Sequence, residues 1–89
     1  MTITELVLKG RGRAGSRGAW RAERPGDGNT YLYHYGTLML AWTHAGLDGV
    51  RVIHTSQGRN SVSDQGGMNK AFRALGLSLY FSRKDGTIR

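Results

Sequence analysis

The sequence predicts an α+β fold, a mostly antiparallel sheet of four to five strands with one helix packed on one face. Two observations support this prediction. Short apolar, β-favouring runs separated by turn residues occupy most of the chain up to residue 55, and a helical period follows in residues 61–76. A chain of 89 residues is expected to form a single domain, residues 1–89, with a small core.

The first predicted strand is residues 3–8, an apolar and β-favouring run that stops just before Gly10. The segment that follows, residues 10–18, is rich in arginine and glycine. A free arginine–glycine tail would lack apolar structure on at least one side, whereas this segment has a strand candidate on each side. We therefore predict a mobile basic loop within a hairpin, with Trp20 anchoring its far end.

The second predicted strand is residues 18–24. Small or apolar residues alternate there with charged ones. The alternation would place Trp20 and Ala22 on one face of the sheet and Arg21 and Glu23 on the other.

The strongest strand signal is the aromatic and β-branched run at residues 30–43. It follows a predicted turn at residues 25–29, where Pro, Gly, Asp and Asn cluster. The larger apolar side chains change parity at Gly36, which indicates a bulge or a break into two strands. A hairpin loop at residues 45–49 and a return strand at residues 50–55 complete this part of the predicted sheet.

The helical signal begins at Ser61, which is predicted to cap the helix together with Asp64 three residues later. Gly76 is suited to the position just after the helix. Four apolar residues recur on one helical face: Met68, Ala71, Phe72 and Leu75. A last strand at residues 77–83 and a turn at residues 84–86 are predicted to follow.

The charge of the chain indicates an anionic partner. The net charge is +7 and the isoelectric point is about 10.6, values typical of nucleic-acid-binding domains. The basic residues concentrate in residues 1–24 and 70–89, whereas the middle of the chain is slightly acidic. The expected partner is nucleic acid or an acidic protein surface. The alternative is that the basic surface only aids solubility.

The residues expected to contact this partner are basic or aromatic. They are Arg11, Arg13, Arg17, Arg21, Trp20, Tyr31, Tyr33, Tyr35, Arg83 and Lys84. The three tyrosines alternate along a predicted strand and so share one face, where they can stack on unpaired bases while arginines hold phosphates. The alternative is that the rings only cover the second face of the sheet.

No pattern in the sequence predicts catalysis. His34, His44 and His54 recur every ten residues, but an extended strand would separate the first two by about 30 Å, too far for a shared metal. The best nucleophile and base set is Ser61, Ser63, Asp64 and His54. It lacks a strained elbow motif, and serines at a helix start are usually caps. We expect a protein that is not an enzyme, with no catalytic residues, no metal site and no cofactor.

The sequence also bears on location. It contains no cysteine and no apolar run of about 18 residues or more. Its first residues lack the basic and apolar regions of a signal peptide. A cytoplasmic protein without a membrane partner is expected, and the oligomeric state stays open.

A group of short motifs lies between Tyr33 and Phe72: YHYGTLMLAW, then VRVIHT, then NSVSD. This arrangement resembles small proteins encoded by actinobacteriophages and their hosts, which carry a Tyr-x-Tyr-x-Thr-x-x-Ala strand, a short return strand and a Ser/Thr-rich helix start. The matching positions are Tyr33, Tyr35, Thr37, Leu40, Ala41, Ser61 and Ser63. The histidine that usually follows the Ser/Thr pair is missing here, since Gln65 and Gly66 occupy that region. The resemblance implies a phage or prophage origin and an α+β fold, but no activity.

The expected function is that of a small, basic, non-enzymatic phage-type binding protein that engages nucleic acid or a nucleoprotein complex in the host cytoplasm. Small phage proteins often bind and block host machinery, so inhibition of host defence, as by anti-CRISPR proteins, is one candidate role. The alternative is a protein–protein interaction module that docks on an acidic protein surface without nucleic acid.

Overall fold

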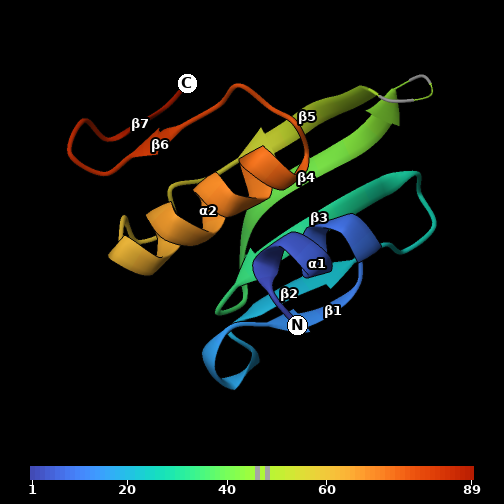
Figure 1. Cartoon of the computed structure of the whole chain (residues 1–89), viewed down its shortest axis with the longest axis horizontal. Helices are drawn as coiled ribbons and strands as arrows, with labels where there is room; N and C mark the ends of the chain where they lie inside the picture. The colour runs from blue at the N-terminus through green and yellow to red at the C-terminus, as the bar shows by residue number, and fades with distance from the viewer. Residues whose placement is uncertain (46, 48) are drawn as a thin grey trace.

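A five-stranded antiparallel sheet forms the centre of the molecule in the computed structural model, which describes residues 1–45, 47 and 49–89 (Figure 1). Consecutive strands are neighbours in the sheet: β1 (Gly12–Ala14), β2 (Trp20–Glu23), β3 (Asn29–His34), β4 (Thr37–Ala45) and β5 (Gly49–Thr55). Two helices, α1 (Ile3–Lys9) and α2 (Val62–Ala74), lie side by side on one face of this sheet. The predicted α+β fold is confirmed.

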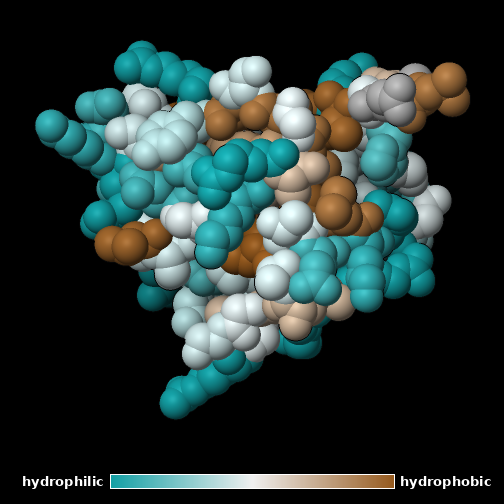
Figure 2. Space-filling view, in the orientation of Figure 1, coloured by the Kyte–Doolittle hydropathy of each residue, from teal (hydrophilic) through white to brown (hydrophobic). Residues whose placement is uncertain are grey.

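The core lies between this face and the two helices, and we call it the inner face of the sheet. Its largest side chains are buried, as expected for a small domain that contains few apolar residues. They come from β2 to β4, from both helices and from Phe81 near the C-terminus: Trp20, Leu32, Leu40, Trp42, Leu6, Val7, Met68, Phe72 and Phe81. The side of the molecule that carries the helices is mostly hydrophilic, with apolar side chains gathered toward the β4–β5 hairpin (Figure 2). Neither helix is long and apolar enough to cross a membrane, as judged over the described residues.

The predicted break at Gly36 is confirmed. Tyr35 and Gly36 both have positive φ, 49° and 80°, and together they form the tight turn between β3 and β4. Such a turn matches the twist of the flanking strands. The register then shifts between Leu32 and Tyr33, which marks a bulge at the start of β4. The predicted hairpin loop at residues 45–49 includes positions 46 and 48, which lie outside the described residues.

The predicted strand at residues 3–8 is wrong, because these residues form α1. The Thr2 hydroxyl accepts a hydrogen bond from the Glu5 amide, and the Glu5 carboxylate accepts one from the Thr2 amide. Gly10 ends the helix in the left-handed conformation with a φ of 73°. These two caps satisfy backbone groups at both ends of a short helix, and they outweigh the β preference of its apolar residues.

The basic loop predicted at residues 10–18 is also partly wrong. Residues 12–14 are strand β1, paired with β2, and residues 16–18 form a short 3₁₀ turn, η1 (Ser16–Gly18). The arginines of this segment are therefore presented by a hydrogen-bonded hairpin. The predicted second strand is confirmed as β2, with Trp20 and Ala22 buried on the inner face.

Helix α2 confirms the prediction made from residues 61–76. Ser61 caps it, and Asp64 completes a reciprocal capping box with the Ser61 amide. Met68 and Phe72 are buried on the predicted face, and Gly76 follows the helix with a φ of 70°.

The last predicted strand, residues 77–83, does not join the main sheet. Only β6 (Phe81–Ser82) is a strand, and it pairs with β7 (Thr87–Ile88) in a separate ribbon beside α2. Asn69 of α2 explains this placement, because its side chain makes two hydrogen bonds with the Phe81 backbone, at 2.7 and 3.0 Å. The side chain thus acts as the partner that a sheet strand would otherwise provide.

Candidate functional site

The face of the sheet opposite the helices carries a row of basic and aromatic side chains. Arg13 of β1 pairs with Arg21 of β2, which pairs with Tyr33 of β3. Residues that face one another in an antiparallel sheet project from the same side. This row is therefore on the side opposite Trp20 and Ala22, and Arg13 is exposed while Arg21 and Tyr33 are half-buried.

The Arg21 guanidinium lies over the Tyr33 ring, 4.3 Å from its centroid. This cation–π contact holds the two side chains in a defined arrangement. Arg21 also forms an ion pair with Glu23 on the same strand. The charge and the ring are thus both held in place by contacts within the sheet.

A second row on the same side contains Tyr31, which pairs with Glu23 and Ala41. The Tyr31 hydroxyl donates a hydrogen bond to Asp27 in the β2–β3 turn. That hydrogen bond and one from the Asn29 amide lower the pKa of Asp27, and the bond to Asp27 raises the pKa of Tyr31. The turn therefore fixes the position of this ring.

Arg51 of β5 pairs with Thr43 and extends the basic character to the far edge of the sheet. We call the surface formed by Arg13, Arg21, Tyr31, Tyr33 and Arg51 the outer face. Among the described residues, no helix packs on it. It combines aromatic rings with three positive charges, of which that of Arg21 is paired with Glu23 on the same face.

Two further arginines predicted to contact the partner lie just before and just after β1 in the sequence. Arg11 precedes β1, and Arg17 lies in η1 with a φ of 56°. Both are exposed.

Four other predicted contact residues lie elsewhere. Trp20 is only 3% exposed, so the expectation that it contacts a partner is wrong. Tyr35 is 76% exposed but lies in the β3–β4 turn, against His34 rather than in the tyrosine row. Arg83 and Lys84 lie in the β6–β7 turn, where the Arg83 side chain donates a hydrogen bond to the Asn60 carbonyl.

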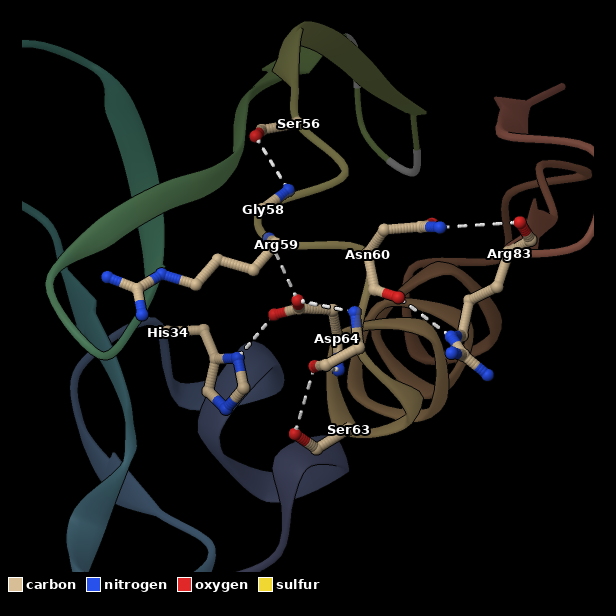
Figure 3. A network of polar contacts seen from close by, with 9 residues as sticks. His34, Ser56, Gly58, Arg59, Asn60, Ser63, Asp64 and Arg83 are labelled. Carbon is tan, nitrogen blue, oxygen red and sulfur yellow. Dashed lines mark hydrogen bonds and ion pairs between the residues drawn. The ribbon is translucent and has the colours of Figure 1, made fainter.

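A separate pocket lies where the β3–β4 turn meets the start of α2, around the polar contacts drawn in Figure 3. Its volume is about 460 Å³, and it is lined by His34, Tyr35, Thr37, Gly58, Arg59, Ser61, Ser63 and Asp64. At its base, His34 Nδ1 lies 2.6 Å from Asp64 Oδ1, and both side chains are buried. This pair joins the sheet to the helix.

Asp64 is surrounded by donors. Its second carboxylate oxygen accepts hydrogen bonds from the amides of Arg59 and Ser61, at 3.1 and 3.0 Å. Burial alone would raise the pKa of Asp64, but the hydrogen bonds from Ser61, His34 and Arg59 outweigh it and lower the pKa. An ionised Asp64 accepts from His34 Nδ1, so this nitrogen carries a proton.

The sequence did not reveal this pair. It placed His54 nearest to Asp64, yet His54 is exposed on β5 and pairs with Ala41. His34 is 30 residues from Asp64, and only the sheet topology brings it there. The one signal available in the sequence was the predicted capping role of Asp64, whose carboxylate is costly to bury without hydrogen-bond donors. Among residues 1–45, 47 and 49–89, no cluster of three metal-binding side chains is present.

The fold and its surfaces define a small α+β protein, a five-stranded antiparallel meander with two helices on one side and a basic, aromatic face on the other. Comparison with protein-family models, curated proteins and solved structures finds no match.

Proposed function

We propose that this protein binds single-stranded nucleic acid on its outer face. The observation that carries the proposal is the cross-strand row of Arg13, Arg21 and Tyr33, in which a guanidinium is held over an aromatic ring on an uncovered sheet. Bases stack on the Tyr31 ring and on the Arg21 guanidinium that lies over the Tyr33 ring, while Arg13 and Arg51 contact the phosphates on either side.

The shape of this surface favours a single strand over a duplex. A duplex hides the faces of its bases, whereas an unpaired strand can lay them against exposed rings. Tyr31 and Tyr33 are two positions apart on β3, so the Tyr31 ring and the guanidinium over the Tyr33 ring offer neighbouring stacking sites. The net charge of +7 adds long-range attraction for the phosphate backbone.

Binding to a host nucleoprotein complex would use the same contacts. Inhibition of host defence through such a complex in the cytoplasm is a proposal that rests on the resemblance to phage proteins alone.

The proposal is tested by fluorescence anisotropy with a labelled single-stranded oligonucleotide at several salt concentrations. Affinity is expected to fall steeply with salt, because binding to phosphates releases counterions. Replacing Arg13 with alanine should weaken binding to all sequences and reduce the salt slope by about one. The matched control is Lys70→Ala, which removes an exposed cation from α2 on the other side of the sheet.

Two results would contradict the proposal. One is an affinity that does not change with salt. The other is an equal loss of affinity in the Arg13→Ala and Lys70→Ala proteins. Binding to an acidic protein with no affinity for the oligonucleotide would favour the protein–protein alternative.

A further inference from the structure

The pocket is lined by a histidine whose second ring nitrogen has no hydrogen-bond partner among the described residues. His34 is only 5% exposed, and its Nδ1 is committed to Asp64. Its second ring nitrogen, Nε2, is on the side of the ring away from Asp64 (Figure 3), and no described residue forms a hydrogen bond with it. Nε2 is therefore free to form a hydrogen bond with a ligand in the pocket.

The orientation of this ring is fixed by its neighbours. Trp20 stacks on His34 with ring centroids 4.0 Å apart and planes inclined by 12°. Tyr35 packs against the same ring at 4.5 Å. Nε2 is therefore held in one position in the wall of the pocket, which reduces the cost of binding a ligand there.

Most of the other polar groups around the pocket can donate hydrogen bonds. Arg59 lines it, and Figure 3 shows its side chain extending over the side of the loop where His34 lies. Its guanidinium forms no ion pair within the described part of the chain. Ser61 and Ser63 contribute hydroxyls, and the first turn of α2 contributes backbone N–H groups that the helix itself cannot pair.

The single carboxylate in the pocket does not oppose an anion strongly. Both oxygens of Asp64 already accept hydrogen bonds, from His34, Arg59 and Ser61. The negative charge of Asp64 is thus compensated by donors within the protein. What remains available to a ligand is a guanidinium, two hydroxyls and a helix N-terminus, which donate hydrogen bonds, and His34 Nε2, which accepts one. This set suits a compact anion with several acceptor oxygens and one P–OH group.

We propose that this pocket binds a phosphate monoester group, with Arg59 and the first turn of α2 donating hydrogen bonds to its oxygens and His34 Nε2 accepting one from the P–OH of its monoanion. The site is separate from the outer face, since His34 belongs to the inner face of the sheet. The phosphate can come from the end of a nucleic-acid strand or from a small phosphorylated molecule.

The test is an NMR titration of the full chain with inorganic phosphate, at constant ionic strength maintained with chloride. We expect amide shifts at residues 58–64 and a shift of the His34 ring signals. Replacing Arg59 with alanine should weaken binding by about tenfold or more, because a hydrogen bond to a charged group is lost. Ser63→Ala is a second variant at an exposed position, where loss of folding is not expected. The control is Arg73→Ala, an exposed arginine in the last turn of α2.

A second titration separates the two sources of phosphate. It compares oligonucleotides of one sequence with a 5′-phosphate and with a 5′-hydroxyl. Arg59-dependent preference for the 5′-phosphate assigns the pocket to strand ends. Binding of inorganic phosphate without that preference assigns it to small phosphorylated molecules.

Either result supports the proposal that the pocket binds phosphate. Absence of shifts at residues 58–64, or equal weakening in the Arg59→Ala and Arg73→Ala proteins, would overturn it. The titration with inorganic phosphate contains no nucleic acid, so its outcome does not depend on the outer face.

Discussion

At the scale of single residues, the contact between His34 and Asp64 links the sheet to α2. One oxygen of Asp64 meets the imidazole, and the other caps the loop and helix start. A buried carboxylate is costly unless donors surround it. Here the donors come from His34, Arg59 and Ser61, so the charge both caps the helix and orients the ring.

This arrangement predicts a defined response to pH. The pKa of Asp64 is lowered in the folded protein, so its ionised form stabilises the fold above its unfolded-state pKa of about 4. That contribution is lost as the pH falls through the folded-state pKa. In the Asp64→Asn protein, the free energy of unfolding should be lower by about 2 kcal/mol at neutral pH and should depend less on pH in the acid range.

Chemical denaturation between pH 7 and pH 2.5 measures both effects. Asp85→Asn is the control, since Asp85 is exposed in the β6–β7 turn. If the Asp64 and Asp85 variants lost stability equally, the role assigned to Asp64 would be wrong.

Tyr33 offers the sharpest residue test of stacking. Its hydroxyl has no hydrogen-bond partner within the described residues, so the ring alone is expected to matter. Tyr33→Phe should bind a single strand within about twofold of the original protein, whereas Tyr33→Leu should weaken binding by about tenfold or more. Anisotropy titrations with one oligonucleotide compare the two, and similar losses in both would argue against stacking.

At the scale of elements, α2 fits the sheet because glycine stands where Trp20 packs. A Cβ at Gly67 would lie 2.0 Å from the Trp20 ring, whereas a Cβ at Gly66 would meet no atom within 4 Å. The neighbouring glycines therefore have different roles, although both weaken the helix intrinsically.

Alanine at these two positions should have opposite effects. Gly66→Ala should stabilise the protein by up to about 1 kcal/mol through helix propensity. Gly67→Ala should destabilise it by about 1–3 kcal/mol, because it displaces Trp20 from His34. Urea denaturation gives both values, and a stabilised Gly67→Ala protein would show that the contact with Trp20 is not tight.

Helix α1 depends on its caps because it has only seven residues. Thr2→Ala removes the hydroxyl that accepts from Glu5 and should cost about 1 kcal/mol. Thr4→Ala is the matched control, since Thr4 is an exposed helical residue whose replacement should be neutral or slightly stabilising. Equal destabilisation of the two proteins in thermal unfolding would contradict the role of the capping box.

The elements differ in how far the sequence could predict them. Strong alternation, a clear turn at residues 25–29 and a capped helical period made β2 to β5 and α2 predictable. Helix α1 was missed because its apolar run favours a strand, and the Thr2–Glu5 capping pair was the signal that decided otherwise. The placement of the β6–β7 ribbon beside α2 could not be predicted, because it depends on the contact between Asn69 and Phe81.

At the scale of the whole molecule, the sheet separates two surfaces of different chemistry. The outer face follows from strand alternation, so Arg13, Arg21, Tyr31 and Tyr33 could be proposed from sequence. Arg51 was missed, and Trp20 and Tyr35 lie elsewhere. The pocket could not be predicted, because His34 and Asp64 meet only after β3 and α2 pack together. A long-range pair of this kind leaves no spacing pattern in the chain.

The central claim is that single-stranded nucleic acid binds to the outer face. Mapping of NMR shifts on addition of a short single-stranded oligonucleotide tests it most directly. We predict the largest changes at Arg13, Arg21 and Tyr33, on β1 to β3, and small changes on the exposed side of α2 around Lys70. Changes centred on α2, or none at concentrations where other basic proteins bind, would contradict the claim.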